Sequence, residues 1–297
     1  DLVQRLEAAL IFWTSQIKEV IQQKDSSEHG ENSRPLDEIE YWRSRTKDLM
    51  YLKQQLETSE VKLICDILEG SGHMSNFKQL ADEIQVGCDS AMNNLLYLST
   101  LQDPCKVLAS APPSKIPEIV PEILQMVSMI WRMSKSYYTS DRITGLLRKV
   151  SNEIIHRCCQ IISLDDIFDG NVHSSMKSLE ESIKAGETWK TICINTFQKL
   201  AAHYEEQQFS RKLEYDANSV FAEIDAFVQR CNDLNEVCEA QIQFGAKGAK
   251  ENENGLPAFS GTKGPEITKS LLDIRHQFEK LVYNLRNVNY PILDLSK

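Results

Sequence analysis

The residues whose types and spacing come closest to known chemistry form a glycine-containing loop, GLPAFSGTK, at 255–263. In a P-loop, G-x4-G-K-[ST], backbone N–H groups cradle the phosphates and the lysine directly follows the second glycine. Here Ser260 occupies the position of that glycine, and Lys263 comes after Thr262. The motif also needs a preceding strand, and no strand pattern is present. The sequence therefore predicts no nucleotide site in this loop.

A metal site is the chemistry suggested by His156, Cys158 and Cys159. However, adjacent helical residues point about 100° apart, and no second pair of ligands lies nearby in the sequence. Cys231 and Cys238 are seven residues apart, which places both on one face of a helix. Because cysteine is among the most frequently buried residues, we interpret these as structural thiols.

Acid–base chemistry is suggested by the adjacent carboxylates Asp165–Asp166, Glu180–Glu181 and Glu205–Glu206. Solvated helix faces account for all three pairs. No Ser/His/Asp or Cys/His/Asp set is marked by the local sequence, although such triads can assemble from remote positions. We therefore assign no catalytic, cofactor-binding or metal-binding residue. Four histidines are interpreted as surface or cap residues: His73, His173, His203 and His276.

Composition narrows the class of protein. The chain has 297 residues, a net charge of −10, 41% apolar and 26% charged residues. The negative charge disfavours nucleic acid as the main partner, because phosphate binding depends on clustered Lys and Arg. No apolar run approaches the roughly 20 residues that span a bilayer, so no membrane insertion is expected. The eight cysteines are spread along predicted helices, which favours reduced thiols in the cytosol.

Helical periodicity dominates, and no alternating strand pattern is evident. We predict an all-α fold of about nine to eleven helices, forming an elongated stack of antiparallel helical bundles. The chain shows no fixed repeat. The expected helices cover residues 2–24, 35–58, 61–68, 77–98 with a possible break at Gly87, 122–138, 141–163, 172–185, 187–207, 216–244 and 266–287.

Three regions are predicted along the chain: an N-terminal bundle at 1–103, a proline-rich crossover at 104–121, and a second bundle at 122–297. The crossover contains APPSKIPEIVP, whose closely spaced prolines oppose a continuous helix. The polar segment DSSEHGENSR at 25–34 and a loop near 246–265 are expected to be flexible.

Two helices carry an apolar seam with steps of three and four residues. The helix at 216–244 has additional apolar residues that widen the seam, which favours bundle packing over an isolated coiled coil. We expect Trp13, Trp42 and Trp131 to be mostly buried, and core packing is also the simplest interpretation of Trp189. The seams comprise Ala217, Val220, Ile224, Phe227, Cys231, Leu234 and Cys238 in the first helix, and Ile267, Leu271, Ile274, Phe278, Leu281 and Leu285 in the second.

Several collinear segments are more specific than amphipathic helices require. They are FW-x3-I at 12–17, PLDEIEYWRSR at 35–45, the pair of apolar helices at 122–155, DIFDG at 166–170, Trp189 in GETWK, and the segment at 213–237. In this order they closely resemble the N-terminal tail, or stem, of dynein heavy chains. The loop LPAFSGTKGPEI resembles a Phe/Gly-rich loop of axonemal rather than cytoplasmic dyneins.

The resemblance implies an early part of the stem, outside the ATP sites and the microtubule-binding stalk, so that this segment would hold no ATP and would not be an enzyme. It implies a structural role in assembling a minus-end-directed microtubule motor and attaching it to cargo or to an axonemal doublet. The implied partners are intermediate chains, light or light intermediate chains, neighbouring heavy chains and docking proteins, in the cytoplasm, the cytoskeleton and the ciliary or flagellar axoneme. The alternative is a helical adaptor or tethering protein unrelated to motors. An enzyme is a third hypothesis, which a deep pocket with convergent polar groups would support.

Overall fold

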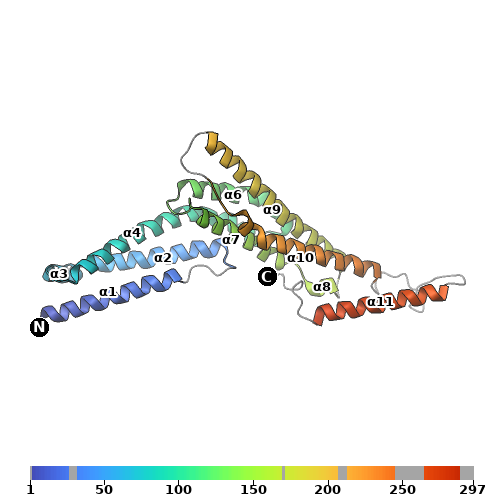
Figure 1. Ribbon diagram of the computed structural model, residues 1–297, viewed down its shortest axis with the longest axis horizontal. Coiled ribbons are helices and arrows are strands. Elements are labelled where there is room, and N and C mark those ends of the chain that lie inside the picture. Colours follow the sequence, from blue (N-terminus) through green and yellow to red (C-terminus); the bar gives the residue numbers. More distant parts are fainter. Residues whose placement is uncertain (1, 27–31, 169–170, 207–212, 245–263, 288–297) are drawn as a thin grey trace. The chain divides into compact units, whose positions relative to one another are not determined.

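The computed structural model describes residues 2–26, 32–168, 171–206, 213–244 and 264–287 (Figure 1). The all-α class is confirmed, because these ranges contain helices and no strand. None of the described helices is both long enough and apolar enough to cross a bilayer. The helices are α1 (Leu2–Ser26), α2 (Pro35–Leu56), α3 (Ser59–Ile67), α4 (Met74–Leu98), η1 (Ser99–Leu101), α5 (Gln102–Ser110), η2 (Pro113–Lys115), α6 (Ile116–Met133), α7 (Ser140–Cys159), α8 (Leu164–Phe168), α9 (Val172–Glu206), α10 (Ala217–Phe244) and α11 (Gly264–Asn287).

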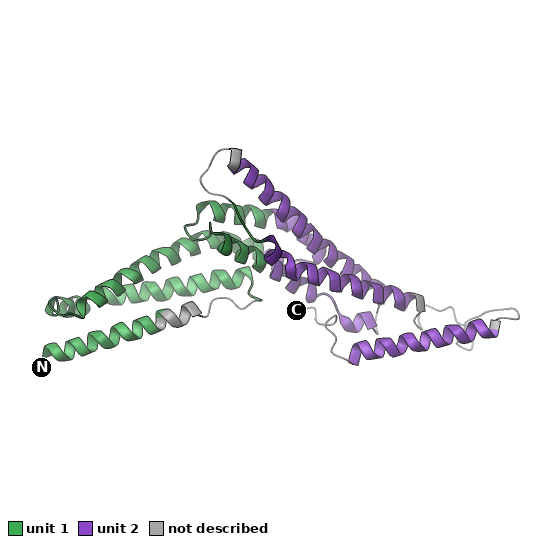
Figure 2. Ribbon diagram, viewed as in Figure 1, with its two compact units in different colours: residues 1–106, 122–150, 209–216 green, residues 107–121, 151–208, 217–297 purple. Residues whose placement is uncertain are grey.

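The helices group into two compact units (Figure 2). Unit 1 comprises residues 1–106, 122–150 and 209–216, and unit 2 comprises residues 107–121, 151–208 and 217–297. The predicted boundaries at 1–103, 104–121 and 122–297 stay a prediction, because compactness alone does not define independently folding domains. The flexible segments expected at 25–34 and near 246–265 lie mostly outside the described residues.

Unit 1 is organised around the antiparallel helices α2 and α4, which pack along each other (Figure 1). Pro35 begins α2, where its missing N–H would have no intrahelical acceptor, and the backbone N–H of Arg34 donates to Asp37 Oδ2 at 2.9 Å. Helix α4 runs through Gly87 without the break that the sequence allowed. A Cβ at Gly87 would lie 3.5 Å from Leu49 Cδ1 of α2, so this glycine lies at the helix–helix contact.

Helices α5 and α6 extend further into the proline-rich segment than the sequence predicted. Pro104 is the third residue of α5 and Pro117 is the second residue of α6. Both prolines lie in a first helical turn, where a missing N–H costs no intrahelical hydrogen bond. Pro121 is accommodated inside α6. Within the predicted crossover, the irregular backbone is therefore limited to a short break in α-helix at 111–115.

Unit 2 contains one long helix where two were predicted. Helix α9 is continuous over 35 residues and passes through Gly186, the expected break. A Cβ at Gly186 would lie 2.7 Å from Val228 Cγ2 and 3.4 Å from Ile224 Cγ1, both on α10. Gly186 therefore permits close approach of two helices instead of ending one, which periodicity within a single helix cannot reveal.

Helices α9 and α10 are antiparallel and form the main contact of unit 2 (Figure 1). The α10 seam faces this contact, with each side chain at most 1% exposed from Val220 to Cys238. Helix α11 also contacts α10, but none of its described side chains is buried. The short helix α8 packs against α9, and the Arg286 guanidinium of α11 lies 3.5 Å from Asp165 Oδ1 of α8.

Candidate functional site

Among the described residues, the groups that suggested chemistry lie on α7, α8, α9 and α10. The loop at 255–263 lies outside the described residues. His156, Cys158 and Cys159 are on α7, where Cys158 is buried and the His156 ring Nε2 lies 3.0 Å from the Gln160 amide. Across the described ranges, no group of three or more His, Cys, Asp and Glu side chains is placed to hold a metal ion.

The cysteines are free thiols, and most of them are packed inside the helical units. Burial raises the pKa of Cys193 to about 12 and that of Cys238 to about 11. Burial likewise raises the pKa of Cys231. A reactive cysteine needs the opposite shift, because the thiolate is the nucleophile and the metal ligand. The interpretation of Cys231 and Cys238 as structural thiols agrees with these environments.

The two carboxylate pairs whose side chains are described belong to no group that could hold a metal ion. Asp165 and Asp166 lie in the first turn of α8, where Asp165 pairs with Arg286. Glu181, in α9, lies 3.9 Å from the Lys177 ammonium one turn earlier, and its neighbour Glu180 is exposed. Solvated helix faces therefore explain these two pairs. The side chains of Glu205 and Glu206 lie outside the described part of α9.

The tryptophans differ in burial. Trp42 is 8% exposed, Trp131 is 1% exposed and Trp189 is fully enclosed, so the expected burial of Trp42 and Trp131 is confirmed. The Trp189 indole N–H donates to Ser151 Oγ at 2.9 Å. Trp13 is only partly buried, because one side of its ring borders a cavity.

The most unusual polar group of unit 1 is centred on Glu38, which is 3% exposed although it carries a carboxylate. One carboxylate oxygen, Oε1, accepts from the Tyr137 hydroxyl and from the Trp42 indole N–H, the latter at 3.0 Å. The other oxygen, Oε2, pairs with the Lys149 ammonium. We call Glu38, Trp42, Tyr137 and Lys149 the Glu38 cluster.

The surroundings of the Glu38 cluster are mostly desolvated. Burial, together with the adjacent carboxylate, raises the pKa of Tyr137 above its ordinary value. Burial lowers the pKa of Lys149, and the attraction of Glu38 opposes that change. The Arg142 guanidinium adds a positive charge 5.9 Å from the Trp42 ring centroid, within the range of a cation–π contact.

The Glu38 cluster is suited to fixing helices rather than to acid–base catalysis. Its members come from α2, from the segment after α6 and from α7, and the two α2 residues bond to partners 95 to 111 residues later in the sequence. Each member is under a tenth exposed and satisfies another, so a dissolved substrate does not reach them. Removing one partner of a buried ion pair leaves the other charge buried and unpaired, which is strongly destabilising. The Glu38 cluster therefore fixes how these helices pack against one another.

Sequence reasoning missed Glu38, Tyr137 and Lys149. One signal was available, because Glu38 precedes Trp42 by four residues and so lies on the same face of α2 as this large apolar anchor. A carboxylate on an apolar face predicts a buried partner. Nothing in the local sequence identifies that partner as Lys149, since the contact depends on how α2 meets α7.

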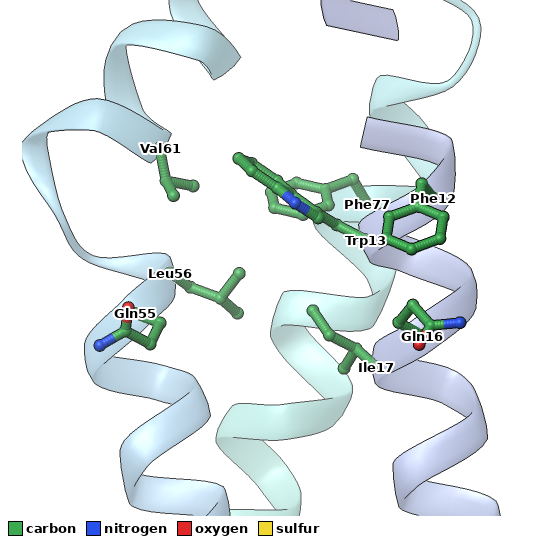
Figure 3. A pocket seen from close by; sticks show the side chains of 8 residues that line it. All are labelled: Phe12, Trp13, Gln16, Ile17, Gln55, Leu56, Val61 and Phe77. Atoms are coloured by element: carbon green, nitrogen blue, oxygen red, sulfur yellow. The ribbon is translucent and has the colours of Figure 1, made fainter. Parts of the chain in front are cut away.

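A second feature of unit 1 is an apolar cavity of about 330 Å³ between α1, α2, α3 and α4 (Figure 3). Trp13 reaches across it from α1, and Phe77 of α4 lies behind the indole ring. Two glutamine amides, of Gln16 and Gln55, are the polar groups of its lining. The remaining lining residues are Phe12, Ile17, Leu56 and Val61. The cavity lacks the convergent polar groups that the enzyme hypothesis requires.

Residues 3–297 match the family described as "Dynein heavy chain, N-terminal region 1". The match covers both units and therefore includes the Glu38 cluster, the cavity and the α9–α10 contact. The chain belongs to this dynein heavy chain family.

Individual dynein heavy chains show the same relationship over the full chain. The dynein-1-beta heavy chain of the flagellar inner arm I1 complex from Chlamydomonas reinhardtii is 44% identical over 100% of this chain. Mouse dynein axonemal heavy chain 2 is 30% identical, and the Chlamydomonas flagellar outer-arm dynein beta chain is 24% identical, each again over 100% of this chain. The match spans only 5–6% of the length of these relatives.

The predicted resemblance to dynein heavy chains is therefore confirmed. The structure also shows what one of its motifs does in the fold. The motif PLDEIEYWRSR begins α2 at Pro35 and contains both Glu38 and Trp42. Glu38 and Trp42 are thus the residues of this motif that join α2 to Tyr137 and Lys149. The motif therefore contains both the beginning of α2 and two members of the Glu38 cluster.

Proposed function

We propose that this chain is a structural tail segment of an axonemal dynein heavy chain, which supports assembly of the motor complex and its attachment to the axonemal doublet. The proposal rests on the family match over residues 3–297. It also rests on the similarity of the whole segment to axonemal and flagellar heavy chains. The corresponding location is the ciliary or flagellar axoneme.

The structure supports a mechanical rather than a catalytic role. The buried polar groups of the Glu38 cluster are hydrogen-bonded or ion-paired to one another. The long helices bury continuous seams, as in the α9–α10 contact, and such a bundle can transmit force along its axis. The ATPase activity of the parent chain is assigned to regions outside this segment, and no nucleotide is assigned to residues 1–297.

The proposed partners are intermediate chains, light or light intermediate chains, neighbouring heavy chains and docking proteins. An acidic surface favours basic patches on a partner, and rim charges of this kind mainly affect the association rate and its salt dependence. Association through this segment is therefore expected to weaken as ionic strength rises.

The test removes residues 3–297 from the heavy chain in a flagellated cell and measures three quantities. We expect the heavy chain and its intermediate chains to be depleted from isolated axonemes, while the ATPase activity of the extracted motor is retained. A second variant keeps the segment but replaces exposed Glu and Asp by Lys, which should reduce assembly without unfolding the helices. Normal axonemal content in the deletion would refute the assembly role, and loss of ATPase activity would refute the assignment of catalysis elsewhere.

A further inference from the structure

Helix α11 carries a complete apolar seam that its own unit leaves partly uncovered. The seam steps by four and three residues over five turns and has no buried member. Ile267 is 44% exposed, Ile274 is 46% exposed and Leu281 is 57% exposed. These three residues are seven apart and form one continuous line along the helix, which we call the open stripe.

The seam of α10 shows what such a pattern becomes when a partner is present. It has the same order of steps, from Val220 to Cys238, and each of its residues is at most 1% exposed against α9. The two seams therefore differ in their neighbours and not in their periodicity. An isolated line of large aliphatic side chains at this spacing is the signature of a helix that lacks a partner.

One side of α11 is already occupied. The helix contacts α10, and Arg286 pairs with Asp165 of α8. Leu271, Phe278 and Leu285 are partly buried on that side. The open stripe lies about 40–60° around the helix from these partly buried residues, along the exposed edge of the side that α11 packs within unit 2.

The residues of the seam indicate what kind of partner fits. In heptad positions, Leu271, Phe278 and Leu285 take a, whereas Ile267, Ile274 and Leu281 take d. Leucine at a with isoleucine at d favours bundles of more than two helices. The flanking e and g positions, which select partners by charge in coiled coils, are Thr268, Ser270, Arg275, Gln277, Val282 and Asn284. Only one of these six flanking residues, Arg275, is charged. The seam is therefore suited to packing in a helical bundle and not to a coiled coil whose partner is selected by charge.

We propose that the open stripe is covered by a helical hairpin of the same heavy chain, formed by the segment that directly follows Lys297. This inference rests on the proposed function, because it takes the parent chain to be a heavy chain like the relatives, of which this match spans 5–6%. Consecutive helices usually pack side by side, and α10 already fills the place of the preceding neighbour. The following segment therefore takes the exposed edge of α11 that carries the open stripe.

The test compares cysteine labelling in two proteins: residues 1–297, and the same chain extended past Lys297 by about 70 residues, enough for two helices and short connections. Ile274→Cys and Leu281→Cys place thiols in the open stripe, and labelling at each position is read by peptide mass spectrometry. His276→Cys is the matched control, because His276 is exposed and lies about 200° around the helix from Ile274. Circular dichroism verifies that each variant remains helical.

We expect both stripe cysteines to label rapidly in residues 1–297 and at least about tenfold more slowly in the extended chain, as for a site that opens only transiently. His276→Cys should label equally fast in both. Rapid labelling of the stripe in the extended, folded chain would overturn the proposal. Protection that depends on the concentration of residues 1–297 would instead identify a second copy, and protection that needs axonemal extract would identify another subunit. Either result also overturns it. Axonemal incorporation is scored separately, so an open stripe in a chain that still assembles refutes this inference alone.

Discussion

Helices α10 and α11 have the same apolar periodicity and opposite environments. Both place six apolar residues at steps of four and three. From Val220 to Cys238 the α10 seam is at most 1% exposed, whereas three residues of the α11 seam are 44–57% exposed. The difference is the neighbouring helix, because α9 covers α10 over its length. Periodicity therefore indicates that a helix face can be buried, and the tertiary contact determines whether it is buried.

The sharpest test of this comparison uses the same residue type at the same seam position. Leu234→Ala in α10 should lower the free energy of unfolding by about 3–5 kcal/mol, because it removes packed atoms and leaves a cavity. Leu281→Ala in α11 should change it by less than about 0.5 kcal/mol, as for an exposed surface residue. Urea denaturation followed by circular dichroism measures both. Equal effects of the two substitutions would contradict the assigned environments.

A similar contrast exists within α2, where Glu38 is buried and Glu40 is exposed beside Arg43. Glu38→Ala should destabilise unit 1 by about 3–5 kcal/mol, since it strands the Lys149 ammonium in a desolvated site. Glu40→Ala should cost no more than about 1 kcal/mol, the usual limit for an exposed ion pair. The measurement is again urea denaturation. A double substitution that adds Lys149→Met should recover much of the loss, and failure to recover any would show that the pair is not the origin of the effect.

Gly186 tests how closely α9 and α10 approach each other. Gly186→Ala should lower the free energy of unfolding by about 1–3 kcal/mol, because the new methyl group would overlap Val228. Gly145→Ala in α7 is the control, since a Cβ there meets nothing within 4 Å. That control should raise stability by up to about 1 kcal/mol through helix propensity. Thermal melts of the two variants should shift in opposite directions, and a stabilising Gly186→Ala would show that the helices can separate at no cost.

The thiols of the α9–α10 contact make its stability depend on pH, whereas α11 has no cysteine. In the unfolded chain a thiol loses its proton near pH 9.0, but the folded pKa is about 12 for Cys193 and about 11 for Cys238. The folded state then binds more protons, so this stabilising contribution is complete below pH 9 and is lost as pH rises toward 11–12. Each thiol should cost about 1.4 kcal/mol per pH unit in this window. Urea midpoints up to about pH 10 in reductant should fall less steeply for Cys238→Ala, and an unchanged slope would contradict burial of that thiol.

The smallest expected effect concerns the ion pair between Arg286 of α11 and Asp165 of α8. Asp165→Asn removes the charge opposite Arg286, a pair whose side chains are 89% and 46% exposed. Global stability should change by less than about 0.5 kcal/mol. Amide hydrogen exchange should nevertheless accelerate in α11 and remain unchanged in α10. Equal acceleration in both helices would show that α10 and α11 unfold as one cooperative element.

The sequence by itself determined the all-α class and the family. Most helix boundaries could be predicted because they depend on local chemistry, as Pro35 in the first turn of α2 shows. The resemblance carried by PLDEIEYWRSR was also sufficient to identify dynein heavy chains, without knowledge of what its residues contact.

Tertiary structure alone decided the features that depend on two distant segments. Gly186 was expected to end a helix, and Pro104–Pro121 to be irregular, because a single helix contains no information about its neighbours. The pairing of Glu38 with Lys149 spans 111 residues, and the opposite exposure of Leu234 and Leu281 follows no local signal. Local sequence fixes hydrogen bonding within a helix, whereas burial is a property of contacts between helices, and those contacts exist only once the chain has folded.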